Sequence, residues 1–466
     1  MMTTRDTSVL HRLVLNVSIF VGVALLAMVA VPLWAQAKAE PESEAADRGR
    51  IALTKRSFLS PEWSLEAYRK AAEHWEELAP DPNTDPVAYA EAFRQRLGLH
   101  PAPYPNDGLP MGLRLATSKD GSRTGLQIDC MVCHGGSIGG QSYLGLGNTQ
   151  LDMGTLYEDL YAADGRPLGF IRFTVNTARG TVNAGQMSAT LLSLRNRDLS
   201  KRKFPLPLGS HFAEIDTPAW WNLKHKKTMY QDGRTDSDSV RSLMQFMLAE
   251  LTIEEFEELE PTFKDIQAYL KSLEPPIYPF EIDRPLAERG RVLFEASCAN
   301  CHGTYGPGGE YPNRIVELDI IGTDPVRALA PSDLLVAHYN ATWFAEHEPV
   351  DEQMVGYQAP PLDGIWATAP YLHNGSVPTL FHLLQSKERP DRYTRPPSTD
   401  FEHYDTRRVG WKFETVDDET GEFASRREVR SIYDTSRRGL GNGGHTFGDD
   451  LSEVERMAVI EYLKTL

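Results

Sequence analysis

The stretch Cys130-Met-Val-Cys133-His134 decides how the rest of the chain is interpreted. Two thiols three positions apart, followed at once by an imidazole, suit covalent attachment of haem c, because the sulfurs bond the vinyl groups and the histidine binds the iron. A second copy, Cys298-Ala-Asn-Cys301-His302, follows later in the chain. The two copies use all four cysteines, so the sequence predicts two covalently bound haem c groups and no disulfide bond.

Two other sites use pairs of cysteines at this spacing. A zinc site does not require a histidine directly after the second cysteine. A thioredoxin-type redox dithiol is expected near a βαβ pattern, which we do not find in this sequence. Haem c attachment therefore remains the favoured interpretation of both motifs.

Length and charge limit the organisation and the partners. A chain of 466 residues has room for two domains of roughly 100 to 200 residues each. We expect an N-terminal haem domain over residues 46–275 and a C-terminal one over 284–466, with the proline-rich Glu274–Pro279 as a stiff linker. The formal net charge of -17 argues against nucleic acid as a partner and favours a basic or neutral one.

Residues 1–39 are predicted to be a targeting segment. Arg5, His11 and Arg12 precede an apolar run from Leu13 to Trp34, and Ala35-Gln-Ala37 offers a cleavage site. The run is longer than the roughly 7 to 15 residues of a signal core and close to the roughly 20 of a membrane span. We favour cleavage, with retention as an inner-membrane anchor as the alternative. Both outcomes place the body of the protein in the periplasm, where c-type haem is attached.

The predicted elements are mostly helices. Ser64 to Leu78 is expected to be a helix, whereas proline and glycine make Ala79–Met111 irregular. Six glycines in Gly135–Gly147 would let the backbone pass close to a flat macrocycle. A capping box begins a helix over Thr252–Leu273.

The C-terminal half has the clearer pattern. Asp283 is a predicted N-cap for a helix that leads into Cys298, and a capping box at Ser452 begins a C-terminal helix. Lys387–Gly444 is polar and aperiodic, and we expect a surface insertion there. The predicted fold is mainly α, with two cytochrome c-like haem domains, long loops and few strands.

One long stretch carries a family resemblance. Tyr357-Gln-Ala-Pro-Pro-Leu-Asp-Gly-Ile-Trp-Ala-Thr-Ala-Pro-Tyr-Leu-His-Asn-Gly-Ser-Val377 resembles the T-A-P-Y-F-H-D-G-S-V segment of bacterial di-haem cytochrome c peroxidases. The segments Asp216–Asn222 and Asp232-Gly-Arg234 are similar to that superfamily too. The ending Gly444-His445-Thr-Phe-Gly448 most resembles its rubber-oxygenase-like branch.

The resemblance implies a role for each haem. The N-terminal haem, with His134 as proximal ligand, would be reactive, and the C-terminal haem, with His302, would carry electrons. The peroxidases use a methionine as the sixth ligand of the second iron, but no methionine lies between Val377 and Gly444. His445 would replace it, as in the rubber oxygenases, with Met354 in reserve.

Further residues follow from the same resemblance. Gln231 stands where the peroxidases have a bridging tryptophan, and Trp220 or Trp221 would substitute for it. Arg241 and Glu250 fall near the distal acid-base pair that cleaves peroxide. Phe246 would be the apolar side chain that the rubber oxygenases hold over the haem, which would favour dioxygen as the oxidant.

The peroxidases also bind one calcium ion between their domains. Asn222, Thr368 and Pro370 occupy the matching places, and oxygen ligands suit that cation. His373 would donate a hydrogen bond to a haem propionate rather than bind iron.

These points predict an exported oxidoreductase that reduces hydrogen peroxide or activates dioxygen at the first haem, with electrons passed through the second. A donor cytochrome or cupredoxin would supply the electrons. The alternative is a di-haem electron carrier without chemistry of its own. The oligomeric state is left open.

Overall fold

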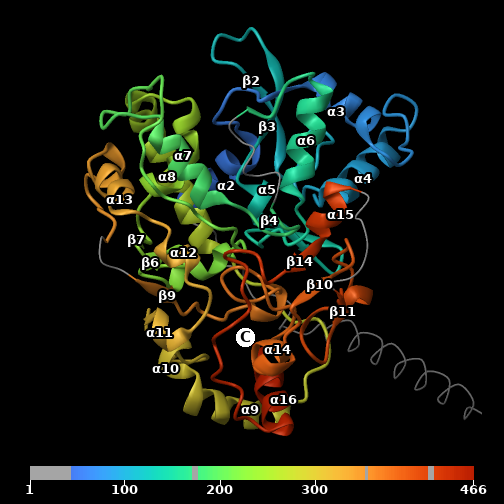
Figure 1. Cartoon of the computed structure of the whole chain (residues 1–466), viewed down its shortest axis with the longest axis vertical. Coiled ribbons are helices and arrows are strands. Elements are labelled where there is room, and N and C mark those ends of the chain that lie inside the picture. The colour runs from blue at the N-terminus through green and yellow to red at the C-terminus, as the bar shows by residue number, and fades with distance from the viewer. Residues whose placement is uncertain (1–43, 170–176, 352–354, 418–424) are drawn as a thin grey trace, which may run out of the picture. The chain divides into compact units, whose positions relative to one another are not determined.

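A computed structural model describes residues 44–169, 177–351, 355–417 and 425–466 (Figure 1). Residues 44–466 form one compact unit. The predicted leader and the reserve ligand Met354 lie outside the described residues. Within the described residues no helix is long and apolar enough to cross a membrane. The predicted boundary between residues 275 and 284 stays a prediction.

The fold is mainly helical, as predicted, and its strands are short and antiparallel. The α-helices are α2 Glu44–Lys55, α3 Leu65–Lys70, α4 Pro86–Leu97, α5 Met131–His134, α6 Met153–Ala163, α7 Ala184–Ser193, α8 Ile253–Ser272, α9 Arg284–Ser297, α10 Ala299–His302, α11 Leu318–Ile321, α12 Val326–Leu329, α13 Asp333–Asn340, α14 Leu380–Leu383, α15 Arg426–Ser431 and α16 Glu453–Leu463. The 3-10 helices are η2 Ala71–His74, η4 Trp220–His225, η5 Arg241–Ala249, η6 Trp343–Ala345, η7 Ile365–Ala367, η8 Ser386–Glu388 and η9 Phe401–His403.

The strands form small sheets. A three-stranded sheet has the order β1-β3-β2, a second has the order β13-β10-β14, and four further pairs are β4-β5, β6-β7, β8-β9 and β11-β12. Their bounds are β1 Trp63–Ser64, β2 Leu113–Thr117, β3 Thr124–Ile128, β4 Gly135–Ile138, β5 Gln141–Leu144, β6 Thr228–Met229, β7 Thr235–Asp236, β8 Ile315–Glu317, β9 Gly356–Gln358, β10 Arg392–Thr394, β11 Tyr404–Asp405, β12 Gly410–Trp411, β13 Glu414–Thr415 and β14 Ile432–Asp434.

The sheet β1-β3-β2 leads directly into the first cysteine motif. Strand β3 ends at Ile128, and Asp129 then accepts a hydrogen bond at 2.8 Å from the backbone N–H of Met131 at the start of α5. The buried Arg114 on β2 donates to Asp129 at 2.5 Å and to the carbonyls of Leu53 and Arg56 at 2.9 Å. This guanidinium therefore fixes the motif to the sheet and to the end of α2.

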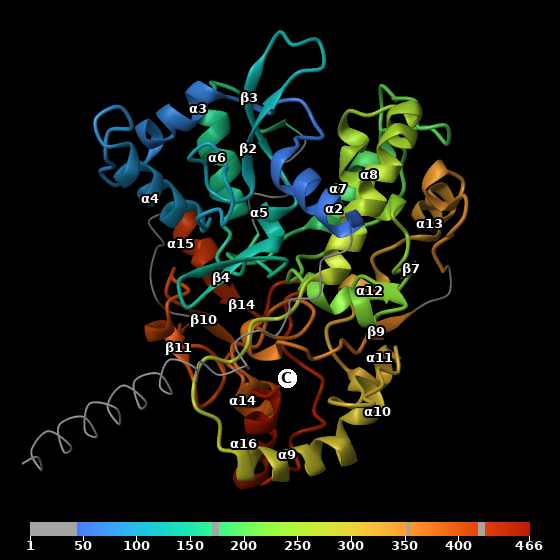
Figure 2. The same ribbon diagram turned by 180° about the vertical axis from the view of Figure 1, so that it is seen from behind.

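The second motif is delivered by a helix instead. Asp283 caps α9 by accepting from the N–H of Leu286 at 3.0 Å, and α9 ends at Cys298. Helix α16 crosses α9, as Figures 1 and 2 show, and a capping box at Ser452 begins it. Both predicted helices are confirmed, as is the predicted helix around Thr252, which forms α8 with Pro261 inside it.

Three expectations need correction. The helix that begins at Ser64 is shorter than predicted, because α3 tightens into η2 and ends at His74. The stretch expected to be irregular, Ala79–Met111, contains helix α4. Asp85 is its N-cap, Pro86 is its first residue, and Gly98 is its C-cap with φ +66°. The buried face of α4 has helical spacing, with Tyr89, Phe93 and Leu97 four residues apart. The turn residues around this short helix made the pattern difficult to recognise.

The third correction concerns Lys387–Gly444. This segment is not a surface insertion, because Tyr393, Trp411 and Tyr433 are buried in it. Tyr393 and Tyr433 stack at 5.3 Å between ring centroids across the paired strands β10 and β14. The strands are only two or three residues long, so the stacked Tyr393 and Tyr433 of β10 and β14 hold the sheet together without a periodic pattern in the sequence.

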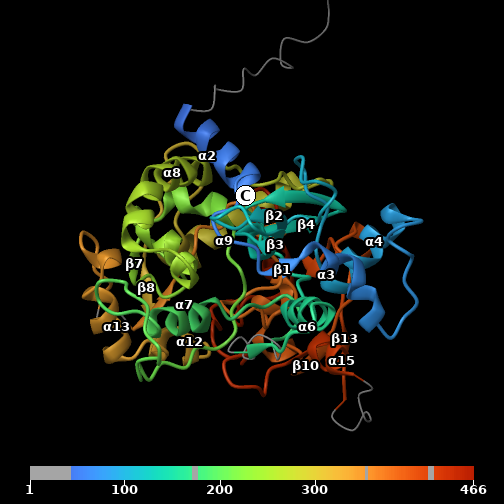
Figure 3. The same ribbon diagram turned by 90° about the horizontal axis from the view of Figure 1, so that it is seen from above.

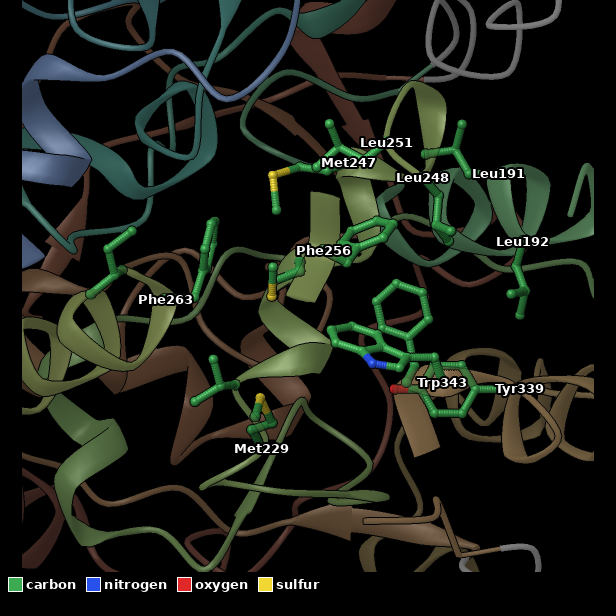
Figure 4. Close-up of a cluster of buried hydrophobic side chains, with 14 of the residues drawn as sticks. Leu191, Leu192, Met229, Met247, Leu248, Leu251, Phe256, Phe263, Tyr339 and Trp343 are labelled. Carbon is green, nitrogen blue, oxygen red and sulfur yellow. The ribbon is translucent and has the colours of Figure 1, made fainter. Parts of the chain in front are cut away.

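Hydrophobic clusters join residues from both sides of the predicted linker. In the cluster of Figure 4, Phe256 from α8 lies 5.6 Å from Trp343 of η6 between ring centroids. A second cluster brings Trp221 together with Trp366 and Val459. Helix α2 packs along α8, which Figure 3 shows from above. The regions that carry the two cysteine motifs therefore share their cores.

The contact between α9 and α16 predicts a sensitive position. A Cβ atom at Gly290 would lie 1.8 Å from the carbonyl oxygen of Ala458. We expect Gly290→Ala to lower the free energy of unfolding by about 1–3 kcal/mol, because the two helices would have to separate. Urea denaturation measures this change. Arg289→Ala, on the exposed side of the same helix, is the control, and an equal effect of both substitutions would contradict the prediction.

Candidate haem-binding sites

The two motifs adopt the same local structure. Each is a single helical turn in which the histidine N–H donates to the carbonyl of the first cysteine at 3.0 Å, from His134 to Cys130 and from His302 to Cys298. Both thiols of each motif therefore lie on one turn with the imidazole beside them. All four cysteines are free. This is the arrangement that attachment of a haem through two thioethers and one imidazole needs.

The thiols do not resemble a redox dithiol or a metal site. Desolvation raises the pKa of Cys133 to about 12 and that of Cys298 to about 11. A redox-active cysteine needs a lowered thiol pKa, since the thiolate is the reactive form. The described part of the chain also contains no group of three or more His, Cys, Asp or Glu side chains that could hold a metal ion.

The imidazole of His302 has one nitrogen satisfied by the protein. Its Nδ1 lies 2.9 Å from the carbonyl oxygen of Pro360, so Nδ1 carries the hydrogen and the unprotonated Nε2 is able to bind a metal ion. Desolvation lowers the pKa of His302. It also lowers the pKa of His134 to about 4, against the opposing effect of the Pro218 carbonyl. Both imidazoles are thus neutral at ordinary pH, as iron ligation requires.

A second imidazole faces His302. The rings of His302 and His445 lie 6.2 Å apart between centroids, at 60° to each other. Two imidazoles on opposite sides of one metal ion, each with its nitrogen about 2 Å from the ion, have ring centres roughly 6 Å apart. Desolvation, followed by the nearby His302, lowers the pKa of His445 to about 3, so this ring is also neutral. The pair therefore fits two axial ligands of one iron.

The loop around His445 is held in a constrained conformation. His445 has φ +46°, and a Cβ atom at Gly444 would lie 2.2 Å from the carbonyl carbon of Gly322. The buried Arg389 donates to the carbonyls of Asn442, Gly444 and His445 at 2.6, 2.7 and 3.2 Å. A non-glycine residue at positive φ persists only when its surroundings determine it. The hydrogen bonds of Arg389 hold the loop in this conformation, and no sequence pattern predicts them.

The first site has a different neighbour. The indole of Trp220 stacks on the His134 ring at 4.5 Å and 21°. Among the described residues, His134 makes no ring contact with another histidine. The two sites therefore differ: one motif histidine faces a second imidazole, and the other faces a tryptophan.

The residues after Trp220 reach the segment that holds His302. Trp221 donates from Nε1 to the Asp363 carbonyl at 2.8 Å, and the Asn222 amide donates to the Pro361 carbonyl at 3.2 Å. Pro361 directly follows Pro360, whose carbonyl accepts from His302. The predicted tryptophan pair thus connects the two motif histidines, through the ring stack of Trp220 on His134 and the hydrogen bond of Trp221 to Asp363.

The predicted distal residues are held in other contacts. Arg241 donates to the Trp343 carbonyl at 2.7 Å and pairs with Glu260 and Glu346. Glu250, at the end of η5, accepts from the backbone and hydroxyl of Ser60 at 2.7 and 2.6 Å.

Phe246, the third predicted distal residue, and Gln231, at the predicted bridging position, have other surroundings. Phe246 is 47% exposed. Gln231 donates to the Asp216 carbonyl at 2.8 Å, and its own carbonyl accepts from Gln358. Gln231 therefore joins the two segments that carry the family resemblance.

A group of cations surrounds one buried carboxylate. Arg327 binds Asp232 at 2.8 Å, the Arg234 guanidinium lies 3.5 Å from the same oxygen, and Asp232 also raises the otherwise lowered pKa of Lys226. Arg327 Nε and His373 Nε2 are buried and make no hydrogen bond in the described structure. We call Lys226, Arg234 and Arg327 the cation group. Burial, followed by the nearby Arg327, lowers the pKa of His373 to about 3, so this imidazole is neutral. Three fixed positive charges in the cation group share one negative charge, which suits a further carboxylate.

The predicted calcium ligands give one partial signal. The side-chain oxygen of Asn222 is buried and accepts no hydrogen bond in the described structure. Thr368 ends η7, and Pro370 follows a cis peptide bond. The calcium site stays a prediction.

Comparison with known proteins supports a cytochrome in part of the chain. Residues 356–394 match the family described as RoxA-like, cytochrome c-like. This stretch contains Pro360, Asp363 and His373. A cytochrome c-like domain implies covalently bound haem c and haem oxidoreductase activity in general. It supports the rubber-oxygenase-like branch, whereas the wider peroxidase superfamily stays a prediction.

Two relatives extend the similarity. An uncharacterised protein of Sinorhizobium fredii (strain NBRC 101917 / NGR234), y4iM, is 31% identical over 268 residues, which cover 50% of this chain and 57% of y4iM. A second, y4iJ from the same strain, is 31% identical over 262 residues, which cover 42% of this chain and 41% of y4iJ. The chain spans about half the length of these curated relatives.

The number of haems follows from the two motifs. We expect two haems per chain, and one in the Cys130→Ala/Cys133→Ala variant, because each haem depends on its own pair of thioethers. Haem per protein from the pyridine haemochrome spectrum, together with intact mass, measures both. Cys298→Ala/Cys301→Ala should also retain one haem. A single haem in the unmodified protein would contradict the prediction.

Arg389 gives a test of the constrained loop. We expect Arg389→Met to lower the free energy of unfolding by about 3 kcal/mol, because several carbonyls lose their donor. The low-spin haem spectrum of the second site should also become heterogeneous, since His445 is no longer held. Arg407→Met, at an exposed arginine near Glu453, is the control. A spectrum of Arg389→Met identical to that of the control would show that the loop holds its shape without this side chain.

Proposed function

We propose that this chain is an exported di-haem c-type cytochrome oxidoreductase that activates dioxygen or reduces hydrogen peroxide at the first motif, with electrons entering through the second. The observation that carries the proposal is the difference between the two motif histidines. His302 faces His445 at a separation that suits two axial ligands, whereas His134 faces no second imidazole in the described structure. A site with one protein ligand can accept an oxidant, and a site with two favours electron transfer.

Haem c supplies an iron that exchanges electrons and binds dioxygen or peroxide. At the first site, His134 would hold that iron from one side, and Trp220 packs against the imidazole and fixes its plane. Arg114 and Asp129 hold the turn that carries both thiols. These residues orient the group and keep it rigid.

At the second site, the Pro360 carbonyl would set the electronic character of the ligand. A hydrogen bond from Nδ1 to a carbonyl fixes the tautomer and raises the basicity of the other ring nitrogen. The two neutral imidazoles of His302 and His445 would hold a haem suited to storage and transfer of one electron. Arg389 and the loop at Gly444 would hold the second imidazole in place.

The cation group would bind haem propionates. Each haem carries two carboxylates, whereas in the described structure Arg234 and Arg327 share the single carboxylate of Asp232, which also acts on Lys226. The unbonded Arg327 Nε and His373 Nε2 are the donors that a propionate would accept from. This agrees with the role predicted for His373 from the sequence.

The choice of oxidant follows from the distal residues. Peroxide cleavage needs a free carboxylate or other base that moves a proton between the two oxygens. Glu250 is engaged by Ser60, and Arg241 by Glu260 and Glu346, so neither is free for that task in this conformation. Phe246, the apolar side chain that the family resemblance would place over the haem, is 47% exposed. The contacts of Glu250 and Arg241 favour dioxygen over peroxide.

Export to the periplasm, with or without an anchor, and electron delivery by a cytochrome or cupredoxin are part of the proposal. The rival function is a di-haem electron carrier without its own chemistry. It would need a second axial ligand at His134 as well, and both sites would then look alike.

Electron paramagnetic resonance of the ferric and half-reduced protein distinguishes the two functions. We expect one low-spin signal from the His302–His445 site and one high-spin or exchangeable signal from the His134 site, which changes with peroxide or, after reduction, with dioxygen. His445→Ala should convert the low-spin signal to high-spin without changing the other. Two low-spin signals that are indifferent to both oxidants would leave the electron carrier as the function.

A further inference from the structure

A basic hairpin follows α7 and stands out in this acidic protein. Residues 195–204 contain four exposed cations, and the side chain of Phe204 is 70% exposed beside them. Asp198 is the only acidic residue within this stretch. The exposed cations are Arg197, Lys201, Arg202 and Lys203. We call residues 195–204 the basic hairpin.

Backbone hydrogen bonds fix the shape of the basic hairpin. Arg195 pairs with Lys201, and Asn196 donates its N–H to the Ser200 carbonyl at 2.9 Å. The N–H of Arg202 donates to the Leu194 carbonyl at 2.8 Å. The turn is therefore closed rather than an open loop.

Two inward side chains attach the basic hairpin to the core. Leu199 is 1% exposed at φ +60°, and its carbonyl accepts from the buried Arg195 at 2.7 Å. Arg195 also donates to the Leu248 carbonyl. Because these two residues point inward, the cations and Phe204 are presented outward on a rigid support.

The positive charge of the basic hairpin is not compensated. None of its four exposed cations forms an ion pair with a described residue, although acidic residues outnumber basic ones by 65 to 48 in the whole chain. The Asp198 carboxylate accepts from the backbone and hydroxyl of Ser200. Arg197 and Arg202 also help to lower the pKa of the neighbouring His338, after desolvation. A local positive field therefore persists on a chain of net charge -17.

We propose that the basic hairpin docks this protein onto an anionic phospholipid surface. Lysine and arginine next to an anionic leaflet are attracted to the lipid headgroups, and an aromatic ring between them enters the interface. Phe204 has that position, since the Lys203 ammonium lies 5.6 Å from its ring centroid. The ring stands exposed rather than at the base of a groove, which suits a fluid surface better than the packed interface of an acidic protein. The proposal does not depend on haem.

Vesicle binding tests the proposal with the full chain. The probes are vesicles of phosphatidylglycerol in phosphatidylcholine and vesicles of phosphatidylcholine alone, measured by co-sedimentation at low and at high salt. We expect binding to the anionic vesicles only, with loss at high salt because short-range charge attraction is screened. Lys201→Glu/Arg202→Glu should weaken binding by about 30-fold or more, since each lost cation accounts for roughly fivefold. Phe204→Ser should weaken it less.

A matched control distinguishes the effect of the charges of the basic hairpin from the effect of the net charge of the chain. Lys264→Glu/Arg291→Glu changes the net charge by the same amount at two cations that are paired with glutamates elsewhere. It should bind nearly as the unmodified chain does, and circular dichroism checks that all variants are folded. Equal loss in both double variants would overturn the assignment to the basic hairpin.

Other outcomes would assign the basic hairpin a different partner, or membrane binding to a different part of the chain. Equal binding to neutral and anionic vesicles, insensitive to salt, would place membrane contact elsewhere in the chain. Salt-sensitive binding to soluble polyglutamate that the hairpin variants lose, without vesicle binding, would assign the basic hairpin to an acidic protein partner. Either result would overturn the proposal.

Discussion

The hydrogen bond from His302 to the Pro360 carbonyl is the interaction on which the second site depends. An imidazole has two nitrogens, and a ligand histidine must have one of them satisfied by the protein so that the other is free and neutral. Pro360 has no N–H of its own, so its carbonyl can be placed there without a competing donor. The segment after it must then approach the motif helix closely, and Leu362 and Asp363 do so by binding Tyr305 and Trp221. The ring of His445 is placed against the same histidine from a third segment.

The two motifs show how one local structure is positioned by different means. Both form the same helical turn, but α9 delivers the second one and the sheet β1-β3-β2 delivers the first. A helix packed on α16 through Gly290 fixes the second turn by close packing. The first depends on a buried ion pair between Arg114 and Asp129, which is directional. The motif of His302, which faces a second imidazole, is thus held by helix packing. The motif of His134 is held by the ion pair between Arg114 and Asp129.

Much of this could be predicted where a local signal exists. Cys130-x-x-Cys133-His134 and its second copy are complete in themselves, and the capping residues Asp283, Thr252 and Ser452 begin the helices that they predict. The buried aromatic sheet β13-β10-β14 was missed because strands of two or three residues show no period. The role of Arg389 could not be predicted for another reason. Its partners are backbone carbonyls, which every residue has, so no residue pattern indicates the contact. The position of His445 opposite His302 was predicted from the family resemblance and not from residue spacing.

The connection between the two motif histidines limits how independent the sites can be. His134 stacks on Trp220, and two residues later Asn222 binds the Pro361 carbonyl, next to the carbonyl that accepts from His302. Gln231 adds a second link by binding Asp216 and Gln358. The contacts of the two imidazoles are therefore linked through residues 220–222 and 360–361. Shared hydrophobic clusters across the predicted linker resist any separation of the two regions. The two cysteine motifs therefore belong to one packed unit rather than to two parts joined by a flexible chain.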